Sequence, residues 1–462
     1  MTLILPAPLH EGGVMANKRH VLAVTIGLGA AIGVGLVSME PVAGPQKAER
    51  RLVAPTFKVD PFWPKPLPDN WVTGEPGGTC IDSQDHLIIV TRGFQTGGLA
   101  SPEGVGGADT NTGTLGGAFK SKASPPVIEF DTEGNVVRAW GNPALVPAGT
   151  IGPAGNNIGG QNAVLPNSIH GCFVDYQDNI WIGGNGDGVV QKYSHDGTLL
   201  MQIGTKFVCD DGLGGAIPCT GTGGGNVMRT GTSHTLLSLP ADIAVDPANG
   251  EIYIADGYGN HRVVVFDANG HYLRQMGTVG SGDGQFTAGG GGHPHCVVLA
   301  RNGYVYACDR GQDRINIYTK GSGTTAGTFV KAIPIVPGTA ALGTAGSAWD
   351  VDFSPDAVQT FMYESDGGNE IMWILDHAAA LKGNPPAGVP NPAILAGFGR
   401  PGHMAGEFTF LHMMAIDSSG NLYVGETVGG RRVQKFVNCG RDKHDDRGRG
   451  NGRGPRGCGD DD

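Results

Sequence analysis

Three histidines stand where they could share one metal ion. His170, His295 and His412 each lie at the start of a short apolar segment, and 125 and 117 residues separate them along the chain. Three neutral imidazoles that leave a fourth position open form the ligand set of a catalytic zinc ion. We therefore predict that these histidines bind Zn²⁺. His293, two residues before His295, is an alternative middle ligand.

A second set of residues follows apolar segments elsewhere in the chain: Arg92, Tyr258 and Arg310. Positive charge close to a phenol favours its phenolate form, and a phenolate beside a metal ion can act as a general base. We predict that these three residues are catalytic. The alternative is a structural role, because Tyr258 and Arg310 lie in Asp- and Asn-rich segments that are typical of hairpin turns.

A repeat positions both sets of residues. Residues 239–277 form four short runs of alternating apolar residues separated by turns rich in Gly, Asn and Asp, and residues 293–332 repeat the pattern. Such runs predict a four-stranded antiparallel sheet. A sheet unit that recurs and cannot bury both of its faces alone is typical of a propeller blade.

Six such units fit the chain and predict an all-β fold, a six-bladed β-propeller. The last unit ends one strand short, whereas the run 57–61 has no local partner. Pairing this N-terminal strand with the last unit would close the ring and remove exposed sheet edges. Alternate blades of a six-fold ring lie about 120° apart, so the three histidines would converge on its axis. The Gly-rich segments 93–125 and 205–238 are expected to cover a binding face.

The charge of the chain bears on its partners. The formal net charge is −11, and the basic residues form no stripe outside the two ends. This balance argues against nucleic acid as the partner of the folded part. We expect a small-molecule or peptide substrate instead, and a monomer.

The N-terminal region has the pattern of an export signal. Lys18 and Arg19 precede an uncharged, mostly apolar run at residues 21–38, which predicts a secretory signal peptide or an N-terminal membrane anchor. We divide the chain into this region (1–44), the propeller (45–440) and a Gly/Arg/Asp-rich tail (441–462) that we expect to be disordered. The predicted location is periplasmic or extracellular, either released or anchored to the membrane by residues 21–38.

Eight cysteines are compatible with an oxidising compartment. Cys209 and Cys219 bracket a Gly-rich loop, and we predict that they form a disulfide. Four others lie within apolar runs, where a buried free thiol is the commoner state. We therefore predict free thiols at Cys80, Cys172, Cys296 and Cys308.

The repeats resemble NHL repeats, and the site positions resemble those of peptidyl-α-hydroxyglycine α-amidating lyases, which catalyse the second half of peptide C-terminal amidation. The resemblance covers residues 75–437. The segments that carry it are Ile169-His-Gly-Cys-Phe-Val-Asp, His295-Cys-Val-Val-Leu, His412-Met-Met-Ala-Ile-Asp, Ala255-Asp-Gly-Tyr-Gly-Asn-His-Arg, Cys308-Asp-Arg and the position of Arg92.

The resemblance implies a zinc-dependent cleavage of a carbinolamide, N–CH(OH)–COO⁻, into an amide and glyoxylate. Zinc at the three histidines would polarise the substrate's hydroxyl oxygen. Tyr258 would take the hydroxyl proton, while Arg92 and Arg310 would hold the carboxylate.

The chain also departs from that family. Met413 stands where the family has a calcium-binding aspartate, so structural Ca²⁺ is an open question. Gly259 replaces a disulfide cysteine, Phe410 replaces a methionine, and no segment resembles the copper monooxygenase domain that makes the hydroxyglycine. A related hydroxylated small molecule is therefore an alternative substrate. A metal-dependent hydrolase or hydratase, and a non-catalytic exported scaffold that binds a protein or peptide, are alternative functions.

Overall fold

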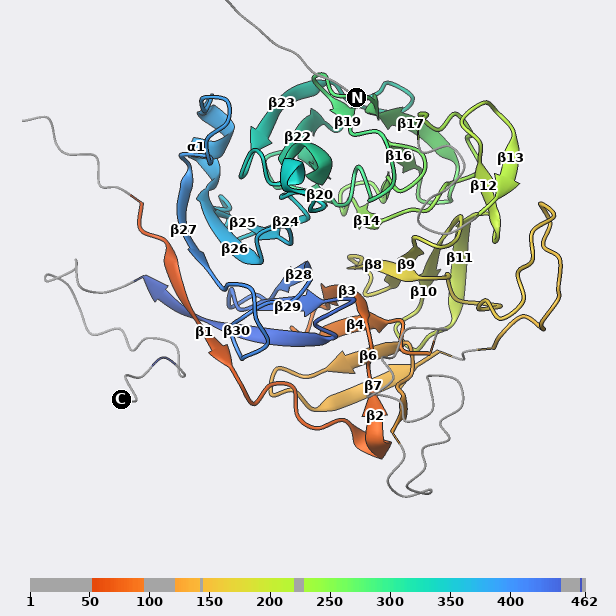
Figure 1. Cartoon of the computed structure of the whole chain (residues 1–462), viewed down its shortest axis with the longest axis horizontal. Helices are drawn as coiled ribbons and strands as arrows, with labels where there is room; N and C mark the ends of the chain where they lie inside the picture. The colour runs from red at the N-terminus through yellow and green to blue at the C-terminus, as the bar shows by residue number, and fades with distance from the viewer. Residues whose placement is uncertain (1–51, 95–120, 142–143, 220–227, 442–457, 459–462) are drawn as a thin grey trace, which may run out of the picture. The chain divides into compact units, whose positions relative to one another are not determined.

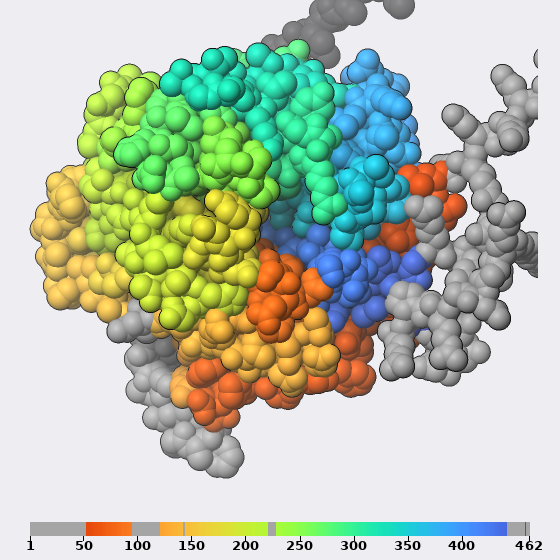
Figure 2. Space-filling model, turned by 180° about the vertical axis from the view of Figure 1, so that it is seen from behind, coloured from red at the N-terminus to blue at the C-terminus, as the bar shows by residue number. Residues whose placement is uncertain are grey.

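Six four-stranded antiparallel sheets follow one another around a ring (Figure 1). The computed structural model describes residues 52–94, 121–141, 144–219, 228–441 and Cys458. In the view from behind, the colours succeed each other around the molecule in chain order (Figure 2). The predicted six-bladed β-propeller is confirmed.

The strands of each blade are given from the axis outward. Blade one contains β3 (Pro76–Ile81), β4 (Leu87–Thr91), β6 (Val127–Phe130) and β7 (Val136–Trp140). Blade two contains β8 (Ile169–Val174), β9 (Ile180–Gly184), β10 (Val189–Tyr193) and β11 (Leu199–Gly204). Blade three contains β14 (Asp242–Val245), β15 (Ile252–Asp256), β16 (Arg262–Phe266) and β17 (Tyr272–Met276).

The second half of the ring has the same order. Blade four contains β20 (Val297–Leu299), β21 (Tyr304–Asp309), β22 (Arg314–Thr319) and β23 (Phe329–Pro334). Blade five contains β24 (Asp350–Phe353), β25 (Phe361–Asp366), β26 (Ile371–Asp376) and β27 (Ile394–Phe398). Blade six contains β28 (Leu411–Ile416), β29 (Leu422–Glu426), β30 (Arg432–Arg441) and β1 (Pro55–Asp60).

Short elements decorate the loops between these strands. They are η1 (Pro68–Asn70), β2 (Trp71–Val72), β5 (Lys122–Ala123), β12 (Val208–Asp210), β13 (Ala216–Pro218), β18 (Thr278–Val279), β19 (Gln285–Phe286), η3 (Arg310–Gln312), η4 (Ala340–Leu342) and α1 (His377–Lys382). Among the residues that the structure describes, no helix is long and apolar enough to cross a membrane. The predicted segment 21–38 lies outside the described residues.

The N-terminal strand closes the ring as predicted. β1 pairs antiparallel with β30, from Pro55 opposite Arg441 to Asp60 opposite Lys435 (Figure 1). This pairing gives blade six its fourth strand and satisfies an edge of β30 that would otherwise stay open. Phe57 of β1 packs against the rings of Tyr363 and Phe398 in blade five.

The hydrophobic core is divided among the junctions between blades. Buried apolar side chains of the described residues form six clusters, and each cluster joins two neighbouring blades. The cluster between blades two and three, for example, contains Trp181 and Val190 from one sheet and Ile254 and Val264 from the next. A blade therefore buries both of its faces only in the assembled ring.

All eight cysteines are paired, so the prediction of four free thiols was wrong. Cys80–Cys172 joins the innermost strands of blades one and two, and Cys296–Cys308 joins the first two strands of blade four. The predicted Cys209–Cys219 bond is present, and Cys439 pairs with Cys458 of the tail. Four disulfides indicate that the protein matures in an oxidising, exported location.

Three carboxyl groups lie in the channel at the centre of the ring. The innermost strands of all six blades line this cavity of about 340 Å³, which contains Asp242, Asp350 and Asp352. Burial raises the pKa of Asp242 to about 7, although its carboxylate accepts a hydrogen bond from the Val297 amide. Met413, which replaces the family's calcium ligand, is buried in β28 and offers no oxygen ligand from its side chain.

We expect Phe57→Ala to weaken the ring closure. Losing the ring contacts to blade five should lower the free energy of unfolding by about 2 kcal/mol, because Phe57 is only partly buried. Phe62→Ala is the control, since Phe62 is 77% exposed and should change stability by less than about 0.5 kcal/mol. Urea unfolding of both variants measures the difference. Equal effects would show that β1 does not contribute through this packing.

Asp242→Asn should stabilise the protein in a pH-dependent way. The native carboxyl holds its proton up to about pH 7, whereas the unfolded chain loses it near pH 4. Between about pH 4 and pH 7 the native state therefore binds more protons than the unfolded state. Ionisation of Asp242 thus lowers the free energy of unfolding as the pH rises through this interval. In EDTA, the variant should gain roughly 1–3 kcal/mol at pH 7.5 and nothing at pH 4.

Asp267→Asn is the control for this comparison of stability at different pH values. Hydrogen bonds from its own turn hold the pKa of Asp267 below the usual range, so this half-buried carboxylate contributes stability that is lost as the pH falls. The control variant should lose stability at neutral pH. A gain for Asp242→Asn that does not change with pH would contradict the buried, protonated carboxyl.

Candidate metal centre

One position of the repeat, at the start of each innermost strand, carries the three histidines. In blade order this position is occupied by Gly77, His170, Ala241, His295, Trp349 and His412. Histidine therefore alternates with a residue that cannot ligate a metal through its side chain. The alternation brings three imidazoles together from blades that are not neighbours.

The three imidazoles meet in the interior of the ring. Their ring centroids are 4.6–5.0 Å apart, and one nitrogen of each lies within 4.8 Å of the others. His170 Nε2 and His412 Nε2 are 3.0 Å apart. All three side chains are buried. This cluster, which we call the triad, could hold a metal ion.

Backbone carbonyls fix the orientation of two of the rings. His170 Nδ1 lies 2.7 Å from the Ala241 carbonyl oxygen, and His295 Nδ1 lies 2.7 Å from that of Trp349. Because a carbonyl only accepts hydrogen bonds, each Nδ1 carries the proton and each Nε2 is left with its lone pair. His295 Nε2 is buried and has no hydrogen-bond partner among the described residues. A ligating histidine has this arrangement, so the triad fits a metal such as zinc.

Irregular strand pairing aims two of the histidines at the axis. The register between β8 and β9 shifts between His170 and Cys172, and that between β28 and β29 shifts between Leu411 and Met414. A β-bulge of this kind redirects a side chain. Gly171 permits the first shift, because its φ is +72° and a Cβ would lie 2.5 Å from the Ala241 carbonyl oxygen.

Burial also controls the protonation of the triad. Removal from water lowers the pKa of His170, His295 and His412 well below the ordinary histidine value, and the nearby arginines lower it further. The imidazoles are therefore neutral at physiological pH. Neutral imidazole is the form that binds a metal ion.

The predicted second set lies beside the triad. The Tyr258 hydroxyl is 3.2 Å from His170 Nε2 and receives a hydrogen bond of 3.3 Å from Arg310 Nη2. Arg92 donates from Nε to the carbonyl of Ile169 at 2.8 Å and pairs with Glu75 at 3.4 Å. All three side chains line one cavity with His170 and His412.

This cavity has a volume of about 340 Å³ and is lined on one side by Gly290 and Gly291, which precede Gly292 in the same loop. A Cβ on Gly292 would lie 2.9 Å from the ring of Tyr258, so this loop contacts the tyrosine through its backbone. Trp349 forms another wall, and the Arg310 guanidinium lies 4.1 Å from the centre of its ring. Arg310 Nε is buried without a hydrogen-bond partner in the described part of the chain. The Arg310 side chain lines the cavity, so its positive charge is available to an anionic ligand.

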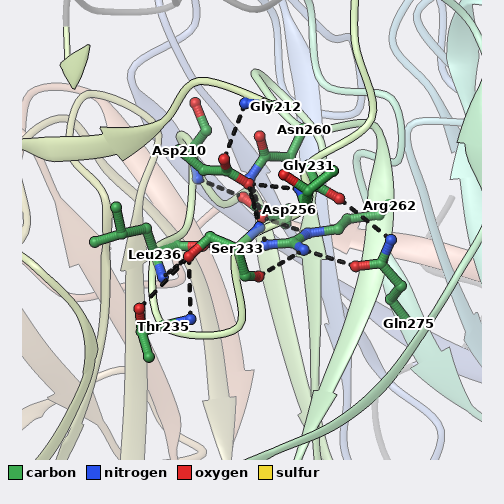
Figure 3. Close-up of polar contacts among 12 residues, drawn as sticks. Asp210, Gly212, Gly231, Ser233, Thr235, Leu236, Asp256, Asn260, Arg262 and Gln275 are labelled. Atoms are coloured by element: carbon green, nitrogen blue, oxygen red, sulfur yellow. Dashed lines mark hydrogen bonds and ion pairs between the residues drawn. The ribbon is translucent and has the colours of Figure 1, made fainter. Parts of the chain in front are cut away.

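A buried arginine holds the hairpin that carries Tyr258 (Figure 3). Arg262 donates from Nε to Asp256 at 3.1 Å, and its other nitrogens bond to the Ser233 and Leu236 carbonyls and to Gln275. Asn260 donates to the same carboxylate at 2.6 Å. The Asp256–Arg262 hairpin is therefore fixed on both sides of Tyr258. The segment therefore has the turn-forming role given above as the alternative, and it also places Tyr258 in the cavity.

Some site residues were not predicted from the sequence. Trp349 supplies both the carbonyl that orients His295 and the ring that stacks on Arg310. Its place at the histidine position of blade five was the signal available in the sequence. His293 does not join the triad, because its ring lies 3.5 Å from the Asp309 carboxylate. Glu75, which pairs with both Arg92 and Arg431, carried no such signal.

The fold and site define a six-bladed β-propeller with a buried histidine triad that could hold a metal ion. A family model described as the NHL repeat matches residues 237–266. NHL repeat-containing protein 3 of Mus musculus is 23% identical over 399 residues, which covers 84% of this chain and 86% of that protein. The chain is thus an NHL-repeat protein and a distant relative of that protein.

Two further relatives concern peptide amidation. Peptidyl-glycine alpha-amidating monooxygenase B of Xenopus laevis is 28% identical over 315 residues, which covers 65% of this chain and 30% of that protein. A probable peptidyl-alpha-hydroxyglycine alpha-amidating lyase of Caenorhabditis elegans is 26% identical over 174 residues, covering 37% of this chain and 42% of the nematode protein. The chain is distantly related to both.

Arg262→Ala should strongly destabilise the protein. It would leave the fully buried Asp256 carboxylate without its cation, at a cost of about 3–5 kcal/mol in the free energy of unfolding. Arg400→Ala removes an exposed pair with Glu407 and should cost less than about 1 kcal/mol. Thermal and urea unfolding compare the two. Similar losses would mean that the Arg262 network contributes little.

Proposed function

We propose that the protein is a zinc-dependent lyase that cleaves an N-acyl-α-hydroxyglycine, or a closely related hydroxylated small molecule, to an amide and glyoxylate. The observation that carries this proposal is the buried triad with the Tyr258 hydroxyl 3.2 Å from His170 Nε2 and 3.3 Å from Arg310 Nη2. The distant relationship to amidating lyases supports the same reaction.

The triad would hold the metal, and the bound Zn²⁺ would supply Lewis-acid polarisation of the substrate's hydroxyl oxygen. Arg310 and Arg92, which both line the cavity, would bind the substrate's carboxylate. Trp349 keeps the Arg310 guanidinium in place by stacking on it. These contacts would orient the substrate with its hydroxyl group towards Tyr258.

Tyr258, as phenolate, would take the proton of the substrate's hydroxyl group. The O–H electron pair then forms the C=O bond of glyoxylate, and the C–N bond breaks. The amide nitrogen keeps the electron pair of that bond and receives one proton, so the reaction neither consumes nor produces water. Arg310 donates a hydrogen bond to the Tyr258 oxygen and so fixes its position beside the triad.

The test is a combined metal and product measurement on the full chain. With α-hydroxyhippurate, the wild type should release glyoxylate, and His295→Ala should abolish release and bind one zinc ion fewer per chain. Tyr258→Phe should keep its zinc and lose at least a hundredfold in kcat, because the proton acceptor is missing.

Two variants serve as matched controls. Tyr272→Phe alters a tyrosine on the outer strand of the same blade, and His271→Ala removes an exposed histidine. Both should keep zinc and activity. Zinc without glyoxylate would contradict the lyase and favour the metal-dependent hydrolase or hydratase. An unchanged metal content in His295→Ala would overturn the triad as a metal site and favour the scaffold.

A further inference from the structure

Four titratable side chains gather at the junction of blades one and two, away from the triad. Glu129 accepts contacts from His86 Nδ1 at 2.8 Å and His195 Nε2 at 2.9 Å through separate oxygens. Asp82 Oδ2 lies 3.7 Å from His86 Nδ1 and 3.6 Å from His195 Nε2. We call Asp82, His86, Glu129 and His195 the junction cluster. Three residues come from blade one, and His195 comes from the turn between β10 and β11.

The other blades show how unusual this arrangement is. In blade two, Asp175 is the counterpart of Asp82, and its Oδ2 accepts from Trp181 Nε1 and pairs with Lys192 Nζ, both at 3.0 Å. In blade six, the counterpart Asp417 accepts from Asn421 at 2.7 Å and Tyr423 at 3.3 Å. The repeat therefore normally satisfies this carboxylate with neighbouring donors.

Blade one has lost these donors. Ile88 stands at the position of Trp181 and Tyr423, and Glu129 stands opposite it, where Lys192 and Lys435 stand in the other blades. His86 stands in the turn before β4, at the position where blades two and six have an asparagine. As a result, the Asp82 side chain is 1% exposed, but its Oδ2 has no hydrogen-bond partner among the described residues and faces a second carboxylate. The Asp82 and Glu129 oxygens lie within 4.8 Å of each other, and two buried carboxylates this close repel unless a cation lies between them.

The orientation of His195 also requires a cation. Its Nδ1 lies 3.1 Å from the Asp178 carbonyl oxygen, so Nδ1 carries a proton. In the neutral ring, Nε2 then presents a lone pair to the Glu129 carboxylate at 2.9 Å. Two acceptors at this distance need a proton or a metal ion between them.

We propose that the junction cluster is a second metal site, which binds a divalent transition-metal ion of the zinc class through Asp82, Glu129 and His195, whose ligand atoms lie within 4.8 Å of one another. One imidazole and two carboxylates are ligands that suit zinc, with a fourth position left for water. Ligand atoms about 2.0–2.1 Å from a tetrahedral zinc ion lie about 3.3 Å apart. His195 Nε2 lies 2.9 Å from Glu129 Oε2 and 3.6 Å from Asp82 Oδ2, and these two distances bracket this value.

The surroundings allow an ion to enter and be retained. The His86 and His195 side chains are 21% and 20% exposed, whereas the two carboxylates are almost fully buried. Arg138 is a nearby cation, 3.6 Å from Glu129 Oε2, and its Nη1 donates to the His195 carbonyl at 3.1 Å, but its side chain is 43% exposed and does not contact Asp82 among the described residues. A bound ion would link the β3–β4 turn and β6 of blade one to the β10–β11 turn of blade two, as Cys80–Cys172 links the innermost strands of these blades.

The test separates this site from the triad. The double variant His86→Asn/Glu129→Lys installs the residue types of blades two and six, so it should fold. His170→Ala/His412→Ala removes the triad. After dialysis against zinc chloride and gel filtration, we expect one zinc ion per chain in the triad variant and none when both sets of substitutions are combined. The junction variant alone should keep the glyoxylate-releasing activity of the wild type.

A stability readout accompanies the metal content. At a hundredfold excess over its Kd, zinc should raise the Tm of the triad variant by roughly 5 °C and leave the combined variant unchanged. Replacing His271, an exposed histidine that pairs with Asp267, by Asn in the triad variant is the control and should preserve the bound zinc. If the triad variant binds no zinc and its Tm does not move, a second proton on His195 holds the cluster together and the proposal is overturned. Failure of the lyase assay would not affect this outcome.

Discussion

The convergence of six innermost strands on one axis governs this structure. Each blade contributes one residue to the same narrow space, so residues more than a hundred positions apart in the chain become neighbours. Three of the six residues are histidines. Of the residues between them, Gly77 leaves room, Ala241 supplies a carbonyl, and Trp349 supplies a carbonyl and a wall of the cavity. The geometry of the triad therefore depends on the closed ring, which places His170 and His412 on strands β8 and β28 and His295 just before β20.

Much of this arrangement follows from the sequence because it is periodic. The spacing of apolar runs predicts six blades, the unpaired run at 57–61 predicts the closure, and the recurrence of histidine in alternate blades predicts the triad. Periodicity reveals which residues share a position in the repeat. It does not reveal distances between blades, which depend on how the sheets pack.

The wrong and missing predictions have one cause, which is that the repeat pattern does not show which residues meet across a blade junction. Cys80 and Cys172 lie in runs that resemble buried strands, and 92 residues separate them, so the pattern alone favours free thiols. Their strands adjoin at a blade junction, which brings the two Cα atoms to 5.4 Å. The junction cluster was missed for the same reason, since His195 and Asp82 come together only across that junction. Trp349, by contrast, could have been found by aligning the repeats at the histidine position.

The closure by β1 also determines when the molecule can be completed. Within the described residues, β1 is hydrogen-bonded to β30, which ends at Arg441, so the first strand of the ring must wait for the last. During synthesis, blades one to five can form while the final edge stays open. Such a long sequence separation makes the closing contact late in folding. A chain that is exported as an unfolded thread would therefore reach its destination before the ring, and with it the triad, could be assembled.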